Sequence, residues 1–253
     1  MTRLLSLNGP DLRRISIACL ALVCGMIISH SAHAQRTPRL VHSGGSGGFI
    51  VGYGSHSLDA FNFFLPSPVS APDNGLINFG GTGYVQLNDW LFGASGWGAS
   101  GPESAVAEAR TRYRAGMGFV QAGYMTHVDY RHKLYPMVGI GYGSAALNFT
   151  RNEALSAEIF PEEPFHETNV QYASMLLQLG LGGEWYIEGK DQADAARREA
   201  SGYMIGMRLH YISGPGAGSG GWSYGGGDIS GAPDHRIEVV QISLILGGGI
   251  YSY

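Results

Sequence analysis

His210 and Ser213 are the residue types of a general base and a nucleophile, and they stand close together in the segment LHYIS. Such a pair works only when the two side chains come within hydrogen-bonding reach and a third group orients the base. Side chains of a regular strand alternate between its faces, so residues three apart point to opposite sides. No acid stands near them in the sequence. We therefore expect no hydrolytic site here, and the chain is predicted not to be an enzyme.

Histidines and acids elsewhere do not predict a metal site. His127 and His132 stand around Asp129 in a turn-like segment, and Pro161–Glu167 (PEEPFHE) is an acidic stretch. Two histidines and one carboxylate in a turn are more often solvated surface than a closed ligand set. We therefore expect no bound metal in either segment.

The glycine-rich stretch Gly214–Pro233 is predicted to be a loop. It contains no lysine and has no strand-to-helix context, which a phosphate-binding loop requires. No cofactor is therefore expected. Trp222 and Tyr224 within this stretch are candidates for contact with a ligand or a partner surface.

The positions that could carry chemistry belong to segments with a strict period of two. In MLLQLGLGGEWYIE, starting at Met175, every second residue is apolar or glycine, and the residues between are mostly polar or small. The same pattern runs from Gly202 to Ser213, with Tyr203 and Tyr211 at the ends of its apolar side. Period two indicates strands whose two faces meet different surroundings. Because only 14% of the residues are charged, we expect one face to contact lipid and the other to line a closed barrel.

The predicted inward face carries a polar cluster. An eight-stranded barrel is just wide enough inside for side chains to fill it. Glu184 and Arg208 lie on consecutive predicted strands, and we expect them to pair. The cluster is interpreted as a polar plug, and the alternative is a constricted solute path or a proton-sensitive gate in which His210 titrates. Its members are Gln121, Gln178, Glu184, Arg208, His210, Gln241 and Ser243.

Eight segments have the character of strands, which predicts an all-β, antiparallel, up-and-down transmembrane barrel. No segment after the N-terminal leader contains 18 consecutive apolar residues, so helical membrane spans are not expected. The predicted strands are Gly47–Ser55, Ile77–Leu87, Trp90–Ala99, Thr111–Thr126, Tyr135–Phe149, Val170–Ile187, Gly202–Ser213 and Arg236–Tyr253.

The connections between these segments alternate between long and short, as in a barrel with turns at one end and loops at the other. Ser57–Leu65 (SLDAFNFFL) in the first long connection begins with a plausible serine cap and has apolar residues at helical spacing. It is predicted either to be a short helix that caps the barrel mouth or lies at the lipid interface, or to be a loop that packs its phenylalanines on the rim.

The N-terminal residues are typical of a secretory signal peptide. Arginines precede the apolar stretch Ile15–Ile28, and Ala32 and Ala34 form an A-x-A pattern before Gln35. Residues 1–34 are therefore predicted to be the leader, 35–46 a lead-in, and 47–253 the barrel. Both cysteines of the chain lie in this leader, so no disulfide is expected. A formal net charge of −4 with only 16 basic residues argues against a nucleic-acid partner.

The C-terminal residues carry a resemblance. GGGIYSY ends in Tyr253, with Tyr251 two residues before it and Gly248 five before the end. This resembles the C-terminal recognition signal of small bacterial outer-membrane β-barrel proteins, with the architecture of the OmpA, OmpX and OmpW type. The polar residue that such signals often carry seven from the end is Leu246 here. The resemblance implies a bacterial outer-membrane location, with outer-membrane lipid, periplasmic chaperones and the barrel-assembly machinery as partners.

The function expected from these features is a structural, surface-binding or limited passive-transport role in the outer membrane. Three alternatives stay open. One is a narrow porin or binding barrel for a small or apolar solute, and another is a secreted soluble β-barrel. The third is a lipid-modifying enzyme, since LHYIS resembles the His and Ser of lipid A deacylase barrels. In that family, however, the two residues are two apart and share one face.

Overall fold

The computed structural model of the chain describes a set of ranges that covers the barrel and parts of its connections. Among these residues no helix has the length and apolar character needed to cross a membrane. The predicted leader at residues 1–34, the segment 152–166 and Tyr253 lie outside them. The described residues are 43–56, 58, 61–62, 75–101, 103–106, 109–128, 132–151, 167–188, 199–214, 222–224, 227–229 and 236–252.

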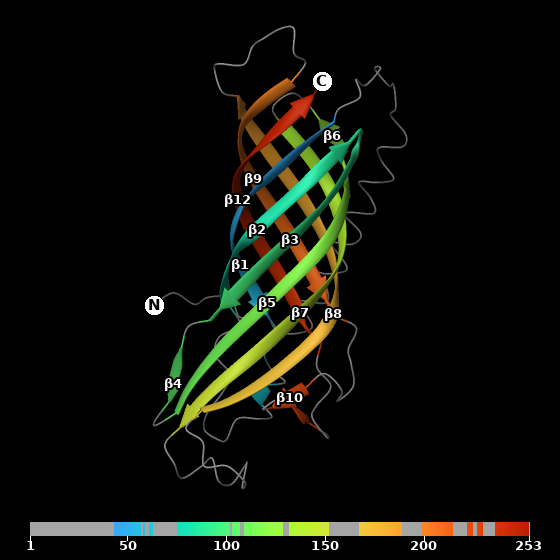
Figure 1. Cartoon of the computed structure of the whole chain (residues 1–253). Helices are drawn as coiled ribbons and strands as arrows, with labels where there is room; N and C mark the ends of the chain where they lie inside the picture. Colours follow the sequence, from blue (N-terminus) through green and yellow to red (C-terminus); the bar gives the residue numbers. More distant parts are fainter. Residues whose placement is uncertain are drawn as a thin grey trace.

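Eight long strands within the described ranges form one closed antiparallel barrel (Figure 1). Each strand pairs with the next long strand in the sequence, and the last pairs with the first, from Ser43 opposite Ser252 to His56 opposite Val239. The prediction of an eight-stranded up-and-down barrel is therefore confirmed. The strands are β1 (Ser43–His56), β2 (Gly75–Leu87), β3 (Trp90–Ser100), β5 (Ala109–Tyr124), β7 (His132–Arg151), β8 (Glu167–Glu188), β9 (Glu199–Ser213) and β12 (Glu238–Ser252).

The two ends of the barrel differ in their connections. At the short-turn end, β2 and β3 are joined by Asn88 and Asp89, and Asn88 has a φ of 56°, a left-handed conformation that asparagine tolerates. Residues 125–131 and 189–198 make the other two connections at this end. The long-loop end, at the bottom of Figure 1, carries the connections 57–74, 101–108, 152–166 and 214–237.

Four short strands pair with the ends of the long strands or with one another. β4 (Ser104–Val106) pairs with the start of β5, and β6 (His127–Val128) pairs with the start of β7. β10 (Trp222–Tyr224) pairs with both β8 and β11 (Gly227–Asp228). β5, β7 and β8 are also longer than β3, so one side of the barrel wall extends beyond the rest at the long-loop end, as Figure 1 shows.

The alternation in the sequence produces the two faces of the wall. Outward apolar side chains form a band around the barrel, which we call the apolar belt. Leu179 is half-buried and belongs to this outward face, whereas Gln178 is buried. The exposed members of the belt include Phe49, Val51, Phe79, Val85, Phe92, Val120, Val138, Ile140, Leu177, Ile205, Leu209, Ile242, Leu244 and Leu246.

Several predicted boundaries need correction. β1 begins at Ser43, so the last residues of the predicted lead-in are part of the barrel. β5 ends at Tyr124, and the next residue, Met125, leaves the ladder to donate its N–H to the carbonyl of Asp89 at 2.8 Å. β12 begins at Glu238 rather than Arg236.

The predicted helix at Ser57–Leu65 is described only at Leu58, Phe61 and Asn62. These residues make a single tight turn, in which the N–H of Phe61 donates to the carbonyl of Leu58 at 3.0 Å. The side chains of Leu58 and Phe61 are both fully buried inside the end of the barrel. Leu58 and Phe61 therefore contribute to the core at the mouth of the barrel.

Candidate functional site

The barrel interior is built in three layers along its axis. The carboxylate cluster, defined as Glu184, Arg208, Tyr84, Tyr135 and Tyr186, lies toward the short-turn end. The amide layer follows, and its members are Asn78, Ser95, Gln121, Gln178, His210, Gln241 and Ser243. The apolar layer fills the long-loop end, and it includes Leu58, Phe61, Trp97, Tyr113, Leu147, Tyr172, Trp222 and Val239.

Glu184 is the centre of the carboxylate cluster, and its side chain is completely buried. The hydroxyl of Tyr135 donates to Oε1 at 2.5 Å, and that of Tyr186 donates to Oε2 at 2.7 Å. The hydroxyl of Tyr84 also donates to Oε2. A buried carboxylate is costly unless it is paired and hydrogen-bonded. These three phenols, together with one arginine, meet that requirement.

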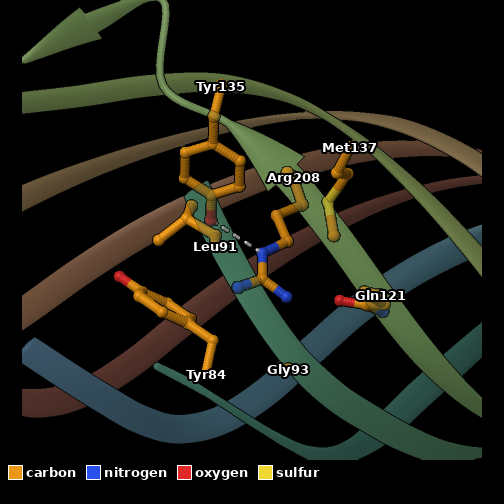
Figure 2. A pocket seen from close by; sticks show the side chains of 8 residues that line it. Tyr84, Leu91, Gly93, Gln121, Tyr135, Met137 and Arg208 are labelled. Carbon is orange, nitrogen blue, oxygen red and sulfur yellow. Dashed lines mark hydrogen bonds between the residues drawn. The ribbon is translucent and has the colours of Figure 1, made fainter. Parts of the chain in front are cut away.

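Arg208 supplies the opposite charge. Its Nη2 lies 3.7 Å from Oε1 of Glu184, and only 2% of its side chain is exposed. Nε donates to the hydroxyl of Tyr135 at 3.2 Å, and Nη1 donates to Oγ1 of Thr82 at 3.0 Å. Figure 2 shows the guanidinium group turned toward Tyr135, with Tyr84 on the same side. Arg208 thus binds strands β2, β7, β8 and β9 together across the lumen.

Gly182 is what allows Tyr135 to reach the cluster. The two residues are directly opposite each other in the β7–β8 ladder. A Cβ at position 182 would overlap the phenol ring of Tyr135. The glycine therefore leaves room for the ring to lie across the neighbouring strand and to place its hydroxyl beside Glu184.

Lys133 adds a second buried cation at the short-turn end. Its Nζ donates to Oε1 of Gln86 at 2.7 Å and lies 4.7 Å from the ring centre of Tyr186. The amide of Gln86 in turn donates to the carbonyl of Asn88 in the two-residue turn at 3.1 Å. The cluster is in this way connected to the turn at the edge of the barrel.

The amide layer is less completely paired than the carboxylate cluster. Nε2 of Gln121 donates to Oε1 of Gln178 at 2.9 Å, and Nε2 of Gln241 donates to Oγ of Ser243 at 2.8 Å. Both ring nitrogens of His210 are buried without a hydrogen-bond partner among the described residues. Since buried polar atoms are nearly always paired, this layer is the least satisfied part of the interior.

The free space beside the cluster is small. A pocket between the carboxylate cluster and the amide layer is lined by Tyr84, Gln121, Tyr135, Met137 and Arg208, among others (Figure 2). Its volume of about 10 Å³ is enough for about one water molecule. It does not have room for an organic solute.

The apolar layer closes the other end of the lumen. The rings of Phe61 and Trp222 meet edge to face with centroids 5.0 Å apart, and Phe61 also contacts Tyr113 at 5.6 Å. Trp222 packs on Tyr172, at 5.1 Å between ring centres. Residues from the first and last long connections therefore meet inside the mouth of the barrel.

The structure places all seven residues of the predicted lumen cluster with buried side chains. It brings Glu184 and Arg208 into contact, as the sequence predicted. Gln121 meets Gln178 and Gln241 meets Ser243, whereas the ring of His210 bonds to none of them. Their exposed fractions are 7% for Gln121, 1% for Gln178, 1% for Glu184, 2% for Arg208, 3% for His210, 1% for Gln241 and 2% for Ser243.

Sequence reasoning missed Lys133 and the three tyrosines of the cluster. The alternation of the strands could have placed them inside the barrel. Lys133 and Tyr135 stand at alternate positions from Gly139 on the inward face of β7, and Tyr186 stands two residues from Glu184 on the inward face of β8. Tyr203, by contrast, is exposed on the outward face of the wall. An aromatic ring with a hydroxyl suits both places, and only the strand parity separates them.

Trp222 requires a correction. It was expected to contact a ligand or partner from an outer loop, but its side chain is fully buried in the apolar layer. Tyr224 is half-buried and keeps part of its surface accessible.

The other predicted positions are placed as follows. His210 faces the lumen, whereas Ser213 lies on the outward parity of β9, so the two residues do not meet. Among the described residues no group of three His, Cys, Asp or Glu side chains is arranged to hold a metal ion. Gly248 and the backbone of Tyr251 belong to β12, while Tyr253 falls outside the described residues.

Comparisons with known proteins concern the fold. Neisserial surface protein A is similar at 10% identity with a TM-score of 0.40, over 84% of this chain and 97% of that chain. Ail, the attachment invasion locus protein of Yersinia pestis, is similar at 14% identity with a TM-score of 0.38, over 84% and 99%. The outer membrane protease OmpT of Escherichia coli is similar at 11% identity with a TM-score of 0.30, over 85% and 97%.

No protein-family model matches the chain, and no curated protein matches it. The fold therefore rests on the strand pairing itself. By that pairing, the long strands of the described residues make this chain an eight-stranded, antiparallel, closed β-barrel.

Proposed function

We propose that the chain is a bacterial outer-membrane protein whose barrel spans the membrane with a closed lumen. It acts as a structural anchor that presents its long-loop end for surface binding. The observation that carries this proposal is the combination of an apolar belt outside with a lumen closed at both ends. The carboxylate cluster fills one end of the lumen and the apolar layer fills the other.

The exposed apolar side chains support a lipid environment. Phe49 is 79% exposed, Val120 68% and Leu177 61%, and they lie on three different strands of the wall. A soluble monomer rarely exposes a continuous apolar surface of this extent. Lipid-facing apolar residues alternating with a filled interior are the pattern of transmembrane barrels.

Aromatic residues gather at the short-turn edge of the belt, which supports a membrane interface there. Trp90, at the start of β3, contacts Tyr124 at the end of β5, with ring centres 5.1 Å apart. Trp185 and Tyr203 are exposed near the same end of β8 and β9. Amphipathic rings are enriched where a barrel leaves the hydrocarbon. Short turns face the periplasm in outer-membrane barrels, so the short-turn end is proposed to lie there. Export through residues 1–34 stays a prediction from the sequence.

The belt can be tested with two variants of β8. Leu181→Arg, on the outward face of β8 opposite Leu209, places a charge among lipid tails in the middle of the belt and is expected to destabilise the folded barrel by about 2–4 kcal/mol. Gln171→Arg lies on the same outward face, beyond the belt, and is expected to change stability by less than about 0.5 kcal/mol. Urea titration in vesicles, followed by the gel mobility of unboiled samples, measures both. Equal effects would contradict the assigned membrane level.

The closed lumen is tested by planar-bilayer recording. The proposal expects the folded barrel to partition into detergent or vesicles and to show no discrete conductance. A chain that stays monodisperse in plain buffer would indicate the soluble alternative, and discrete channels would overturn the closed lumen.

A limited transport role is the second candidate, and the amide layer is the observation that favours it. His210, Gln178 and Gln241 carry buried polar atoms without partners among the described residues, in the middle of the lumen. A polar layer between two closures would pass a small solute only when both closures open. Swelling of vesicles in small neutral solutes tests this, and Leu58→Ala at the long-loop end is expected to raise the rate if the path exists.

We further propose that the chain has no catalytic activity of its own. The support is that His210 and Ser213 lie on opposite faces of β9. Expression in a Gram-negative host followed by mass spectrometry of lipid A is expected to show no change in mass. A change that Ser213→Ala abolishes would instead establish a lipid-modifying enzyme.

A further inference from the structure

Three arginines form a stripe on the outer face of β5 near the long-loop end. Arg110, Arg112 and Arg114 are exposed, while the residues that alternate with them, Thr111 and Tyr113, are buried in the interior. The stripe therefore follows from the parity of the strand. All three guanidinium groups leave the wall on the side that carries the apolar belt.

The stripe begins where the belt ends. The next outward positions on β5 toward the belt are Gly116, Gly118 and the strongly exposed Val120. Gly118 pairs with Tyr142, an exposed aromatic on β7, while Arg114 pairs with the small Ala146 farther out. The wall changes from apolar and aromatic to cationic within a few residues.

The spacing matches the headgroup layer of a membrane. Alternate residues of a strand are about 7 Å apart, and a tilt of about 40° reduces this to about 5 Å along the membrane normal. The headgroup region is about 5–7 Å deep on each side of the hydrocarbon. Arg114 and Arg112 therefore fall at headgroup level, with Arg110 at the outer edge.

Within the described part of the chain, one arginine of this stripe has an acidic partner. Nε of Arg110 lies 3.6 Å from Oε1 of Glu103, a pair that is exposed to solvent. Arg112 and Arg114 contact no carboxylate among the described residues. Their neighbours across the β5–β7 ladder are Asn148 and Ala146, which carry no charge.

We propose that Arg112 and Arg114, with Arg110 at the outer edge, bind phosphate groups of an anionic lipid in the outer leaflet. Guanidinium groups form bidentate, charge-assisted hydrogen bonds with phosphate oxygens. Their aliphatic stems lie along the apolar wall while their charged ends stay at the polar surface. This inference rests on the proposed function, because the stripe is at headgroup level only if the belt lies in a membrane.

The test uses the full chain, fluorescently labelled and folded in octyl-glucoside micelles, titrated with diphosphoryl lipid A. Each arginine is expected to contribute about five-fold to the affinity, so that R112Q/R114Q binds about 25-fold more weakly. Monophosphoryl lipid A is expected to bind more weakly than the diphosphoryl form, and added salt to weaken both. The matched control is R236Q, which removes an exposed arginine beside Glu238 at the same end of the barrel, and it is expected to bind like the unmodified chain.

Three outcomes would overturn the inference: equal affinity of R112Q/R114Q and the unmodified chain, an equal loss in R236Q, or equal binding of the two lipids. Inorganic phosphate is a further arm, and its competition at the concentration of the lipid would show that a free anion, rather than a membrane lipid, is recognised. Insertion into phosphatidylcholine vesicles separates the two proposals. An unmodified chain that inserts without a preference for phosphorylated lipid disproves the stripe alone, whereas one that does not insert disproves the proposed function.

Discussion

The two closures of the lumen use opposite chemistry. At the short-turn end, Glu184 and Arg208 are held by phenols and by each other, with a specific partner for each polar atom of the carboxylate. At the long-loop end, Leu58, Phe61 and Trp222 fill the mouth by apolar contact. The first closure depends on the identity of each partner, because an unpaired buried charge is costly. The second depends mainly on volume, because apolar contacts are not directional.

The largest expected effect comes from breaking the ion pair. Arg208→Met leaves the carboxylate of Glu184 buried without its cation, and we expect a loss of about 3–5 kcal/mol in the free energy of unfolding. Urea titration in vesicles measures the loss. The double variant E184L/R208M removes both charges and is expected to be more stable than Arg208→Met alone. If the single variant were as stable as the unmodified barrel, the two closures would not differ in the way described.

A smaller effect is expected at the apolar end. Leu58→Ala removes a fully buried side chain from the apolar layer without leaving a charge unpaired, so we expect a loss of about 2 kcal/mol in the free energy of unfolding. The same titration applies. A loss as large as that of Arg208→Met would show that the mouth is as rigidly determined as the carboxylate cluster.

The smallest losses of stability are expected from two conservative variants, one in each closure. Each keeps an apolar side chain of similar size. Tyr135→Phe removes only the hydroxyl that donates to Glu184 and accepts from Arg208, and we expect it to cost about 1–2 kcal/mol. Phe61→Leu keeps the apolar character of the mouth and is expected to cost about 1 kcal/mol or less. If Phe61→Leu cost more than Tyr135→Phe, side-chain shape rather than hydrogen bonding would determine the stability of both closures.

Much of the fold could be predicted from the sequence, because a membrane barrel imposes a period of two on every strand. The pairing of Glu184 with Arg208 followed from the same parity, since both positions face inward on consecutive strands. The ends of β1 and β5 were less predictable. Where a ladder stops depends on its neighbours, as the hydrogen bond between Met125 and Asp89 shows.

The contents of the two closures were harder to predict. The placement of Trp222 depends on the pairing of β10 with β8. This contact joins distant segments, and the local glycine-rich sequence does not predict it. The turn at Leu58 and Phe61 is likewise fixed by the space inside the mouth, not by helix propensity. Local patterns indicate which way a strand residue points, but they do not indicate where a connection folds back.

The seam between β1 and β12 has a consequence for how the barrel forms. Ser43 and Ser252 are partners in one ladder, although they stand at opposite ends of the described chain. Contacts between such distant positions are slow to form because a large loop must close first. The first strand therefore has its backbone groups satisfied on one side only until the last strand arrives. Closure of the barrel requires β1 to pair with β12, and a copy lacking β12 is expected to expose an open strand edge that invites pairing with other chains.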